Sequence, residues 1–456
     1  MKANRLRGFL LFSIAGGVFQ SPAQQTEADL KLIGEIRVKA ATGDAQSQAE
    51  LGKVFLLGNL GVLKDEAEGV KWVRKAAEQN FAVAQYDLGV CYDTGKGVAK
   101  DATEAAKWYR KAAQKNLPAA EYNLGVCYAK GEGVAKDYSQ ALEWYRKAAE
   151  QNDDAAQAAL ADCYESGQGV PVDTAEALAW YRKAADQGNP NGQLELGGCY
   201  FYGVGVAKDA VEGVKWYRKA ADQGNANGQF VLGSCYFYGN GVPKEAAQAV
   251  MWYRKAAEQG LASAQMDLGI CFQNGSGVTR DAAEAVMWYR KAAEQNHPAA
   301  QYSLGSCYAY GDGVTKDLTE AVKWYRKAAE LNHAEAQFYL GAYYAKGEGV
   351  LKDYVEIVKW YRKAAEQNDA NAQNALGDCY YDGKGVPKDY IEAYKWWFLA
   401  SAQNHQNAKI NVTKLASQIS PQQIAEARNL AQAFKPKDAP LPEVEGPDAL
   451  IKHTFQ

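Results

Sequence analysis

Residues 81–116 read FAVAQYDLGVCYDTGKGVAKDATEAAKWYRKAAQKN, and close variants of this stretch fill most of the 456-residue chain. A tryptophan marks the same place in ten successive copies, at intervals of 36 residues: Trp72, Trp108, Trp144, Trp180, Trp216, Trp252, Trp288, Trp324, Trp360 and Trp396. A fixed period of roughly 20–50 residues is the signature of a solenoid, in which one small unit stacks on copies of itself. The sequence therefore predicts a repeat array rather than a single compact core.

Each copy is predicted to form two helices. Apolar residues recur at helical spacing over 84–94, and Gly95 and Gly97 end this first helix. Asp101, followed three residues later by Glu104, is typical of a capping box at the start of a second helix. Asn or Gly follows each second helix, and both residue types tolerate the left-handed backbone that terminates helices.

The second helix is predicted to face its neighbours with one apolar stripe, made of Ala105, Trp108, Tyr109, Ala112 and Ala113 in the second copy. The first helix carries Gly89 in its middle, and most copies repeat this glycine. Because glycine inside a helix costs roughly 1 kcal/mol relative to alanine, its recurrence indicates a close approach by a neighbouring helix or a tryptophan ring.

The chain begins with features of an export signal over residues 1–23. Lys2, Arg5 and Arg7 precede an apolar stretch at 8–19, and small residues lie before the expected cut after Ala23. The apolar stretch is shorter than the ~20 residues that span a bilayer, so we expect export to the periplasm or beyond, with no stable membrane insertion after cleavage. Cleavage leaves 48 of 51 Lys and Arg against 54 Asp and Glu, a balance that disfavours nucleic acid as a partner.

The pattern A-x-x-x-L-G-x-x-Y-x-x-G-x-G-V-x-K-D…E-A-x-K-W-Y-R-K-A-A resembles the Sel1-like repeat. In the second copy the match is carried by Ala84, Leu88, Gly89, Tyr92, Gly95, Gly97, Val98, Lys100, Asp101, Trp108, Tyr109 and Ala112. Tetratricopeptide repeats are near relatives, but their period is 34 residues and they lack the Gly-x-Gly-Val loop. The resemblance implies an all-α fold, an α/α right-handed superhelical solenoid, whose concave face binds proteins or peptides without a cofactor.

We expect ten repeats over residues 44–404, a capping helix over 24–43, capping helices over 405–434 and a flexible proline-rich tail over 435–456. Two other functions stay open from the resemblance and the aromatic residues: a β-lactam- or cell-wall-active hydrolase, as linked to some cysteine-rich secreted relatives, and a glycan-binding envelope protein. The chain has no Ser-x-x-Lys, His-Glu-x-x-His or Gly-x-Ser-x-Gly motif, so we assign no catalytic or metal-binding residue.

Eight cysteines occupy one column of the repeat: Cys91, Cys127, Cys163, Cys199, Cys235, Cys271, Cys307 and Cys379. Equivalent positions in stacked repeats should lie ~9–10 Å apart, whereas a disulfide needs Cα atoms within ~7 Å. The column therefore predicts free, buried thiols rather than the disulfide framework that an even cysteine count suggests in an exported chain.

Three other columns have simpler expected roles. The Gly-x-Gly loops recur in every copy and are expected to be structural turns, because no phosphate-binding motif follows a strand. The Arg110 and Lys111 column is expected to form a solvated outer stripe, partly neutralised by acidic residues four positions after the arginine, with an anionic surface as the alternative partner. His297, His333 and His405 are expected to be exposed loop residues.

The copies differ most on one face of the first helix, at the columns of residues 83, 87, 90 and 94. The resemblance implies that this face lines the concave surface, and its aromatic and acidic residues suit a partner that carries basic and apolar groups. Drift at solvent-exposed positions, together with aromatic packing, is the alternative. The candidate partner-binding residues are Asp87, Asp162, Glu195, Tyr202, Tyr238, Asp267, Tyr310, Tyr339, Asp378 and Asp382.

Overall fold

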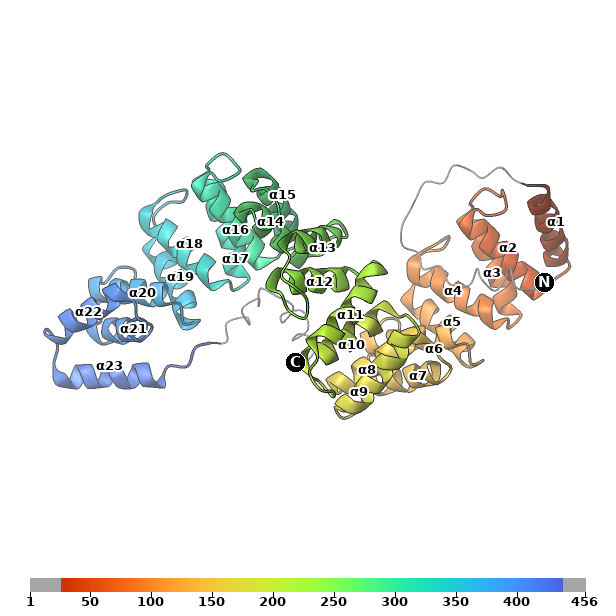
Figure 1. Ribbon diagram of the computed structural model, residues 1–456, viewed down its shortest axis with the longest axis horizontal. Coiled ribbons are helices and arrows are strands. Elements are labelled where there is room, and N and C mark those ends of the chain that lie inside the picture. The colour runs from red at the N-terminus through yellow and green to blue at the C-terminus, as the bar shows by residue number, and fades with distance from the viewer. Residues whose placement is uncertain (1–25, 438–456) are drawn as a thin grey trace. The chain divides into compact units, whose positions relative to one another are not determined.

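The computed structural model describes residues 26–437, and every regular element in that range is a helix (Figure 1). These residues form two compact units that divide after Asp173, inside the fourth copy of the repeat. The expected export signal at 1–23 lies outside the described residues, and so does the tail beyond residue 437. The expected all-α array of helix pairs is confirmed.

The first unit contains α1 (Glu27–Ala41), α2 (Ala45–Leu57), α3 (Glu66–Glu78), α4 (Ala82–Thr94), α5 (Ala102–Ala113), α6 (Pro118–Lys130), α7 (Tyr138–Glu150) and α8 (Asp154–Ser166). The even-numbered helices are the first helices of their copies, and the odd-numbered helices from α3 on are the second helices. Within this unit, each helix packs on the next one along the chain.

The second unit contains α9 (Thr174–Asp186), α10 (Pro190–Tyr202), α11 (Ala210–Asp222), α12 (Ala226–Tyr238), α13 (Ala246–Glu258), α14 (Ala262–Asn274), α15 (Ala282–Glu294), α16 (Pro298–Tyr310), α17 (Leu318–Glu330), α18 (Ala334–Lys346), α19 (Tyr354–Glu366), α20 (Ala370–Asp382), α21 (Tyr390–Ala402), α22 (Gln406–Ala416) and α23 (Pro421–Ala433). The last three helices form the C-terminal end of this unit, where α21 packs against both α22 and α23.

The helix ends follow the sequence signals, with one correction. Asp101 caps α5 by accepting hydrogen bonds from the backbone N–H groups of Thr103 and Glu104. The reciprocal half of the expected capping box is not formed, because the backbone N–H of Asp101 already donates to the carbonyl of Tyr92 in the preceding helix, at 2.9 Å. The Glu104 carboxylate accepts instead from Lys107, one turn later.

The Gly-x-Gly loops are structural turns. Gly95 has φ +76° and donates its N–H to the carbonyl of Cys91, which closes the end of α4. Gly97 has φ +64°, and a Cβ atom on it would lie 2.1 Å from the carbonyl oxygen of Glu66 in the preceding copy. The second glycine of each loop is thus needed for close contact between copies as well as for its backbone conformation.

An aromatic ring lies directly on the bare backbone of the mid-helix glycine. A Cβ atom on Gly89 would be 2.6 Å from Cδ1 of Tyr109 on the second helix of the same copy. The expectation of a tryptophan ring at this contact was wrong for most copies, since the ring belongs to the residue after the tryptophan. Trp108 faces elsewhere, in a buried cluster that includes Val70 and Cys91.

Filling this contact should destabilise the array. In Gly341→Ala the new methyl group would lie 2.6 Å from the Tyr361 ring, and overpacking of this kind costs about 1–3 kcal/mol. Gly34→Ala is the matched control, because Gly34 is a helical glycine of α1 with nothing within 4 Å of the added atom. Urea unfolding followed by circular dichroism should show a lower midpoint for Gly341→Ala, and an unchanged or higher midpoint for Gly34→Ala. A Gly341→Ala protein as stable as wild type would contradict the assigned contact.

Buried glutamines connect three helices in most copies. Gln229 on α12 donates from Nε2 to the carbonyl of Ala221 on α11, at 3.2 Å, and its Oε1 accepts from Nε2 of Gln259 after α13, at 2.8 Å. Glu121 occupies this buried column in the third copy, where it accepts from Nε2 of Gln151 at 2.6 Å. An ionised carboxylate has no hydrogen to donate to the preceding helix, and burial raises the pKa of Glu121.

We expect Glu121→Gln to stabilise the protein by about 1 kcal/mol at pH 7, because it restores a buried donor. A raised folded-state pKa means that the folded wild type holds the proton more tightly than the unfolded chain does. Its stability therefore falls as the pH rises above the ordinary value of 4.5, and the advantage of the variant should shrink at pH 4. Urea unfolding at both pH values measures this difference. Gln157→Glu, in the same unit, should have the opposite sign at pH 7; equal effects at the two pH values would contradict the account.

The eight cysteines are free and buried, as expected. Burial raises the pKa of the Cys91, Cys163 and Cys271 thiols to about 12 and that of Cys127, Cys307 and Cys379 to about 11. Since the thiolate is the reactive form, these side chains act as small apolar groups of the core.

The lysines of the Arg110 and Lys111 columns are mostly exposed, as expected, but the arginines are mostly half-buried. The Arg110 guanidinium donates to the hydroxyl of Tyr128, on the first helix of the next copy, at 2.8 Å. Lys111 places its ammonium group 3.8 Å from the centre of the Trp108 ring. Both contacts recur along the chain, with Arg290 bonded to Tyr308 as one further case, so the columns mainly join and cover scaffold residues.

The histidines also differ from expectation. His297, His333 and His405 are partly buried N-cap residues, each accepting a backbone N–H through Nδ1 at 3.2–3.3 Å. Burial lowers the pKa of His297 and His333 to about 4, so both are neutral near pH 7. The prediction that the histidines follow a loop was correct. Each one caps the start of the next helix, where its ring nitrogen accepts a backbone N–H.

Candidate functional site

The candidate residues lie on what we call the first-helix face, defined by the columns of residues 83, 87, 90 and 94 in each copy. Asp87 and Asp162 belong to the first unit, and the other eight candidates belong to the second. Asp87 on α4 forms an ion pair with Lys53 on α2 at 3.0 Å, and burial raises the pKa of the Asp87 carboxyl group. Asp162 is exposed on α8. Of the two candidate residues in the first unit, Asp87 is therefore paired with a lysine, and Asp162 has an exposed side chain.

Tyrosines give this face of the second unit its accessible aromatic surface. Tyr310, at the end of α16, is 72% exposed, and Tyr238, at the end of α12, is 41% exposed. Tyr238 packs edge-on against Phe237, with ring centres 5.1 Å apart, and this contact fixes its position. The half-buried Tyr202 repeats the arrangement on Phe201 at the end of α10, at 5.0 Å.

The remaining candidates of the middle copies are less accessible. Tyr339 on α18 stacks on Tyr325 with ring centres 5.7 Å apart and also contacts Tyr302 at 5.8 Å. This ring is therefore in part a packing residue, as the alternative interpretation of the face expected. Glu195 on α10 and Asp267 on α14 are half-buried.

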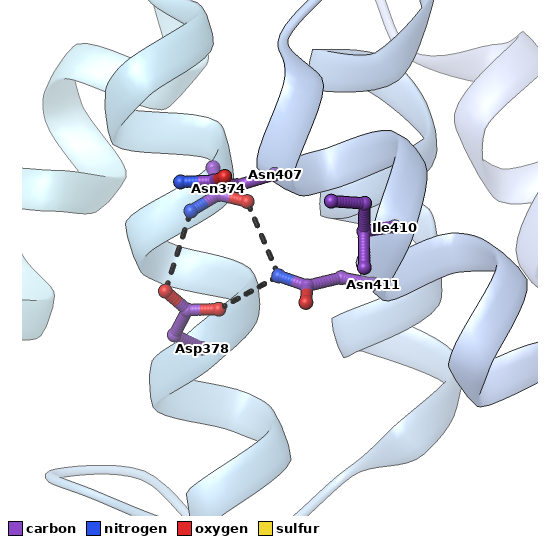
Figure 2. A pocket seen from close by; sticks show the side chains of 5 residues that line it. All are labelled: Asn374, Asp378, Asn407, Ile410 and Asn411. Atoms are coloured by element: carbon purple, nitrogen blue, oxygen red, sulfur yellow. Dashed lines mark hydrogen bonds between the residues drawn. The ribbon is translucent and has the colours of Figure 1, made fainter.

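At the C-terminal end of the second unit, the structure brings candidate residues together with several other polar groups. Asp378 on α20 accepts hydrogen bonds at Oδ1 from the indole N–H of Trp397, at 3.0 Å, and from Nδ2 of Asn411 on α22, at 3.3 Å. Its Oδ2 accepts from Nδ2 of Asn374 at 3.3 Å. Figure 2 shows Asn374, Asp378 and Asn411 with Asn407 and Ile410 of α22. These five residues line a hollow of about 280 Å³.

A second hollow, of about 300 Å³, adjoins the first and shares Asp378 and Asn411 with it. Its other lining residues are Tyr381, Asp382, Lys384, Trp397, Lys414 and Leu415. Asp382 is paired with Lys384 at 2.6 Å, so the two candidate aspartates have different surroundings.

Burial raises the pKa of Asp378 to about 6. The hydrogen bond from Trp397 opposes this shift, and the nearby Asp382 adds to it. Asp378 is thus a carboxyl group that changes its charge in a mildly acidic solution and that gains from a nearby positive charge.

Sequence reasoning identified Asp378 and Asp382 but missed Asn374, Asn407, Asn411 and Trp397. A signal was present in the comparison between copies. The column of Asn374 holds apolar or aromatic side chains in the other nine copies, as in Tyr302 and Phe338, and the column of Trp397 holds tyrosine in copies two to nine. Both departures fall in the tenth copy, beside the change to aspartate at residue 378.

In five of the other copies an aromatic pair fills this space. Tyr302 packs on Tyr325 with ring centres 5.7 Å apart, and Phe338 packs on Tyr361 at 5.8 Å. In the tenth copy, Asn374 removes one ring of the pair, and the indole N–H of Trp397 donates to its backbone carbonyl at 3.1 Å. The loss of the ring opens the space beside Asn374 to polar side chains.

Residues 26–437 contain no group of three or more His, Cys, Asp or Glu side chains arranged to hold a metal ion. They also contain no helix with the length and apolar character needed to cross a membrane.

Successive helix pairs, most of them closed by a ring-on-glycine contact, define an α-helical repeat protein. Its variable surface lies on the first helices. The Sel1 repeat model matches ten consecutive segments, at residues 45–81, 82–117, 118–153, 154–189, 190–225, 226–261, 262–297, 298–333, 334–369 and 370–405. The chain therefore belongs to the Sel1 repeat family.

Two solved structures illustrate the family. A protective antigen of uropathogenic Escherichia coli strains, which displays an SLR fold, is 36% identical, with 90% of this chain and 95% of that chain covered and a TM-score of 0.52. A Sel1 repeat protein from Oxalobacter formigenes is 31% identical, with 74% of this chain and 99% of that chain covered and a TM-score of 0.50. A search of curated proteins gave no match.

Proposed function

We propose that this Sel1 repeat protein is an exported, non-catalytic scaffold that binds a protein or peptide along its first-helix face. The observation that carries the proposal is the contrast between the two helices of each copy. The constant columns of the second helix are engaged in packing, as in the Tyr109 and Arg110 contacts. The first-helix face varies between copies and carries the exposed rings of Tyr238 and Tyr310.

The chemistry of the face favours a particular kind of partner. Exposed tyrosines supply large contact areas at low entropic cost, and aromatic residues are enriched where interfaces are strongest. Carboxylates at Asp162, Asp378 and Asp382 accompany them on the exposed surface. A segment that alternates basic and apolar side chains would complement this arrangement.

Two observations support export. The N-terminal residues have the composition of a cleavable signal, with Lys2, Arg5 and Arg7 before the apolar stretch at 8–19. A relative that is 36% identical is a protective antigen, and such a role requires contact with the immune system of the host.

A photo-reactive amino acid at Tyr238 tests the binding face. Met251 is the matched control, because it is 40% exposed against 41% for Tyr238 but lies on the second helix α13. We expect one protein or peptide of the exported fraction to be captured from Tyr238 and not from Met251, with mass spectrometry as the readout. Equal capture at both positions, or capture only at Met251, would move the interface away from the first-helix face.

Export and the absence of catalysis have separate tests. The N-terminus of the protein isolated from its own cells should begin at Gln24, after a cut behind Ala23; an intact first residue on cytoplasmic protein would contradict export.

The purified protein should not hydrolyse a chromogenic β-lactam, and clear turnover would favour the hydrolase function instead.

A further inference from the structure

The Asp378 hollow has an unequal balance of hydrogen-bonding groups. Its five lining residues include one carboxyl group and three carboxamides, and none of the five is basic. Asn411 uses its Nδ2 group for Asp378 and Asn374, which leaves its Oδ1 on the other side of the amide (Figure 2). Asn407 adds another carboxamide oxygen at the exposed rim. The hollow therefore offers a ligand more acceptors than donors.

The charge of the hollow points the same way. Asp378 is exposed at a polar depression formed by α20 and α22, and a carboxylate in such a setting is stabilised by a nearby cation. The charged groups of the adjoining hollow are Asp382, Lys384 and Lys414. Lys384 is paired with Asp382 rather than with Asp378.

The acceptors and the exposed apolar side chain at the hollow favour a multiply donating cation on a hydrocarbon stem. A guanidinium group carries five N–H donors in one plane and can reach a carboxylate and neighbouring carboxamide oxygens together. Ile410 lines the hollow with a side chain that is 64% exposed. Its apolar surface suits the methylene stem of an arginine side chain.

We propose that the hollow formed by Asn374, Asp378, Asn407, Ile410 and Asn411 is a subsite for an arginine side chain of the bound segment. This inference rests on the proposed binding function and names the chemistry recognised at the C-terminal end of the first-helix face. This specificity of the tenth copy depends on Asn374, because the other nine copies have an apolar or aromatic side chain in its column.

The indole N–H of Trp397 is a built-in reporter, because it donates to Oδ1 of Asp378. We would titrate full-length protein labelled with 15N-tryptophan with N-acetyl-arginine-methylamide, and assign the Trp397 signal from Trp397→Phe. The citrulline analogue is the neutral control of the same shape, and the lysine analogue tests an ammonium group. We expect a saturable shift of the Trp397 signal with the arginine probe, at least tenfold weaker binding of citrulline and weaker binding of lysine.

Two variants separate the subsite from general attraction to an acidic surface. Asp378→Asn keeps an oxygen acceptor for Trp397 and should weaken binding of the arginine probe at least tenfold. Glu426→Gln, an exposed acidic residue of α23 that lines neither hollow, should change it by less than twofold. Binding to wild type should also weaken as the pH falls from 7.5 to 5, because Asp378 then takes up a proton, and Asp378→Asn should lose this dependence.

Equal binding of citrulline and arginine, an equal loss in both variants, or no shift of the Trp397 signal with arginine would overturn the inference. Tighter binding of the lysine analogue than of the arginine analogue would overturn the choice of arginine and identify an ammonium group as the recognised group. Capture from Tyr238 together with a failed arginine titration would leave the proposed function in place and remove only this subsite. If capture from Tyr238 and the arginine titration both fail, the proposal that the first-helix face binds a partner is contradicted.

Discussion

The interaction on which the structure depends is the contact between an aromatic ring and the bare backbone of a glycine in the facing helix. Tyr109 on Gly89 is the pattern, and a Cβ atom at the glycine would overlap the ring in nearly every copy. The missing side chain lets the two helices of a copy approach closely enough to bury Leu88, Cys91 and the alanines of the second helix. Buried glutamines then satisfy backbone carbonyls at the ends of these helices, as Gln85 does for Ala77.

Because this contact recurs along the array, most residues of each copy take part in packing. Tryptophan rings are covered by lysines such as Lys111, and arginines such as Arg110 link each second helix to the following first helix. The tryptophan column, the most visible feature of the sequence, is therefore part of the scaffold. The residues of the first-helix face vary between copies. In the tenth copy the ring contact itself also differs, because Trp397 replaces tyrosine over Gly377.

Much of the fold could be predicted from residue spacing. Helix pairs, aspartate caps, glycine ends and the buried cysteine column all follow from patterns within one copy. The errors concern partners in neighbouring helices. Spacing placed Glu104 correctly for a capping box, but the carbonyl of Tyr92 takes the N–H that it needs. Spacing likewise placed Arg110 on an outer edge without showing that Tyr128 of the next copy would lie within reach.

The candidate site was predicted in part for the same reason. Asp378 and Asp382 were identified because they vary on the first-helix face, whereas Asn374 and Trp397 lie in columns that hold scaffold residues elsewhere. Their role depends on α22, which follows the last repeat and brings Asn411 to Asp378. A comparison of copies finds the departures, but only the packing of the last helices shows that they meet.

Thiol accessibility tests most directly whether the two helices close on each other in the copies that carry a cysteine. Each cysteine follows the glycine column by two residues, as Cys91 follows Gly89, and is buried by the same approach of helices. A thiol reagent at pH 8 should leave all eight cysteines unmodified in the native protein and modify all eight in denaturant. Rapid modification of several thiols in the native protein would show that the copies are open, and would contradict the account.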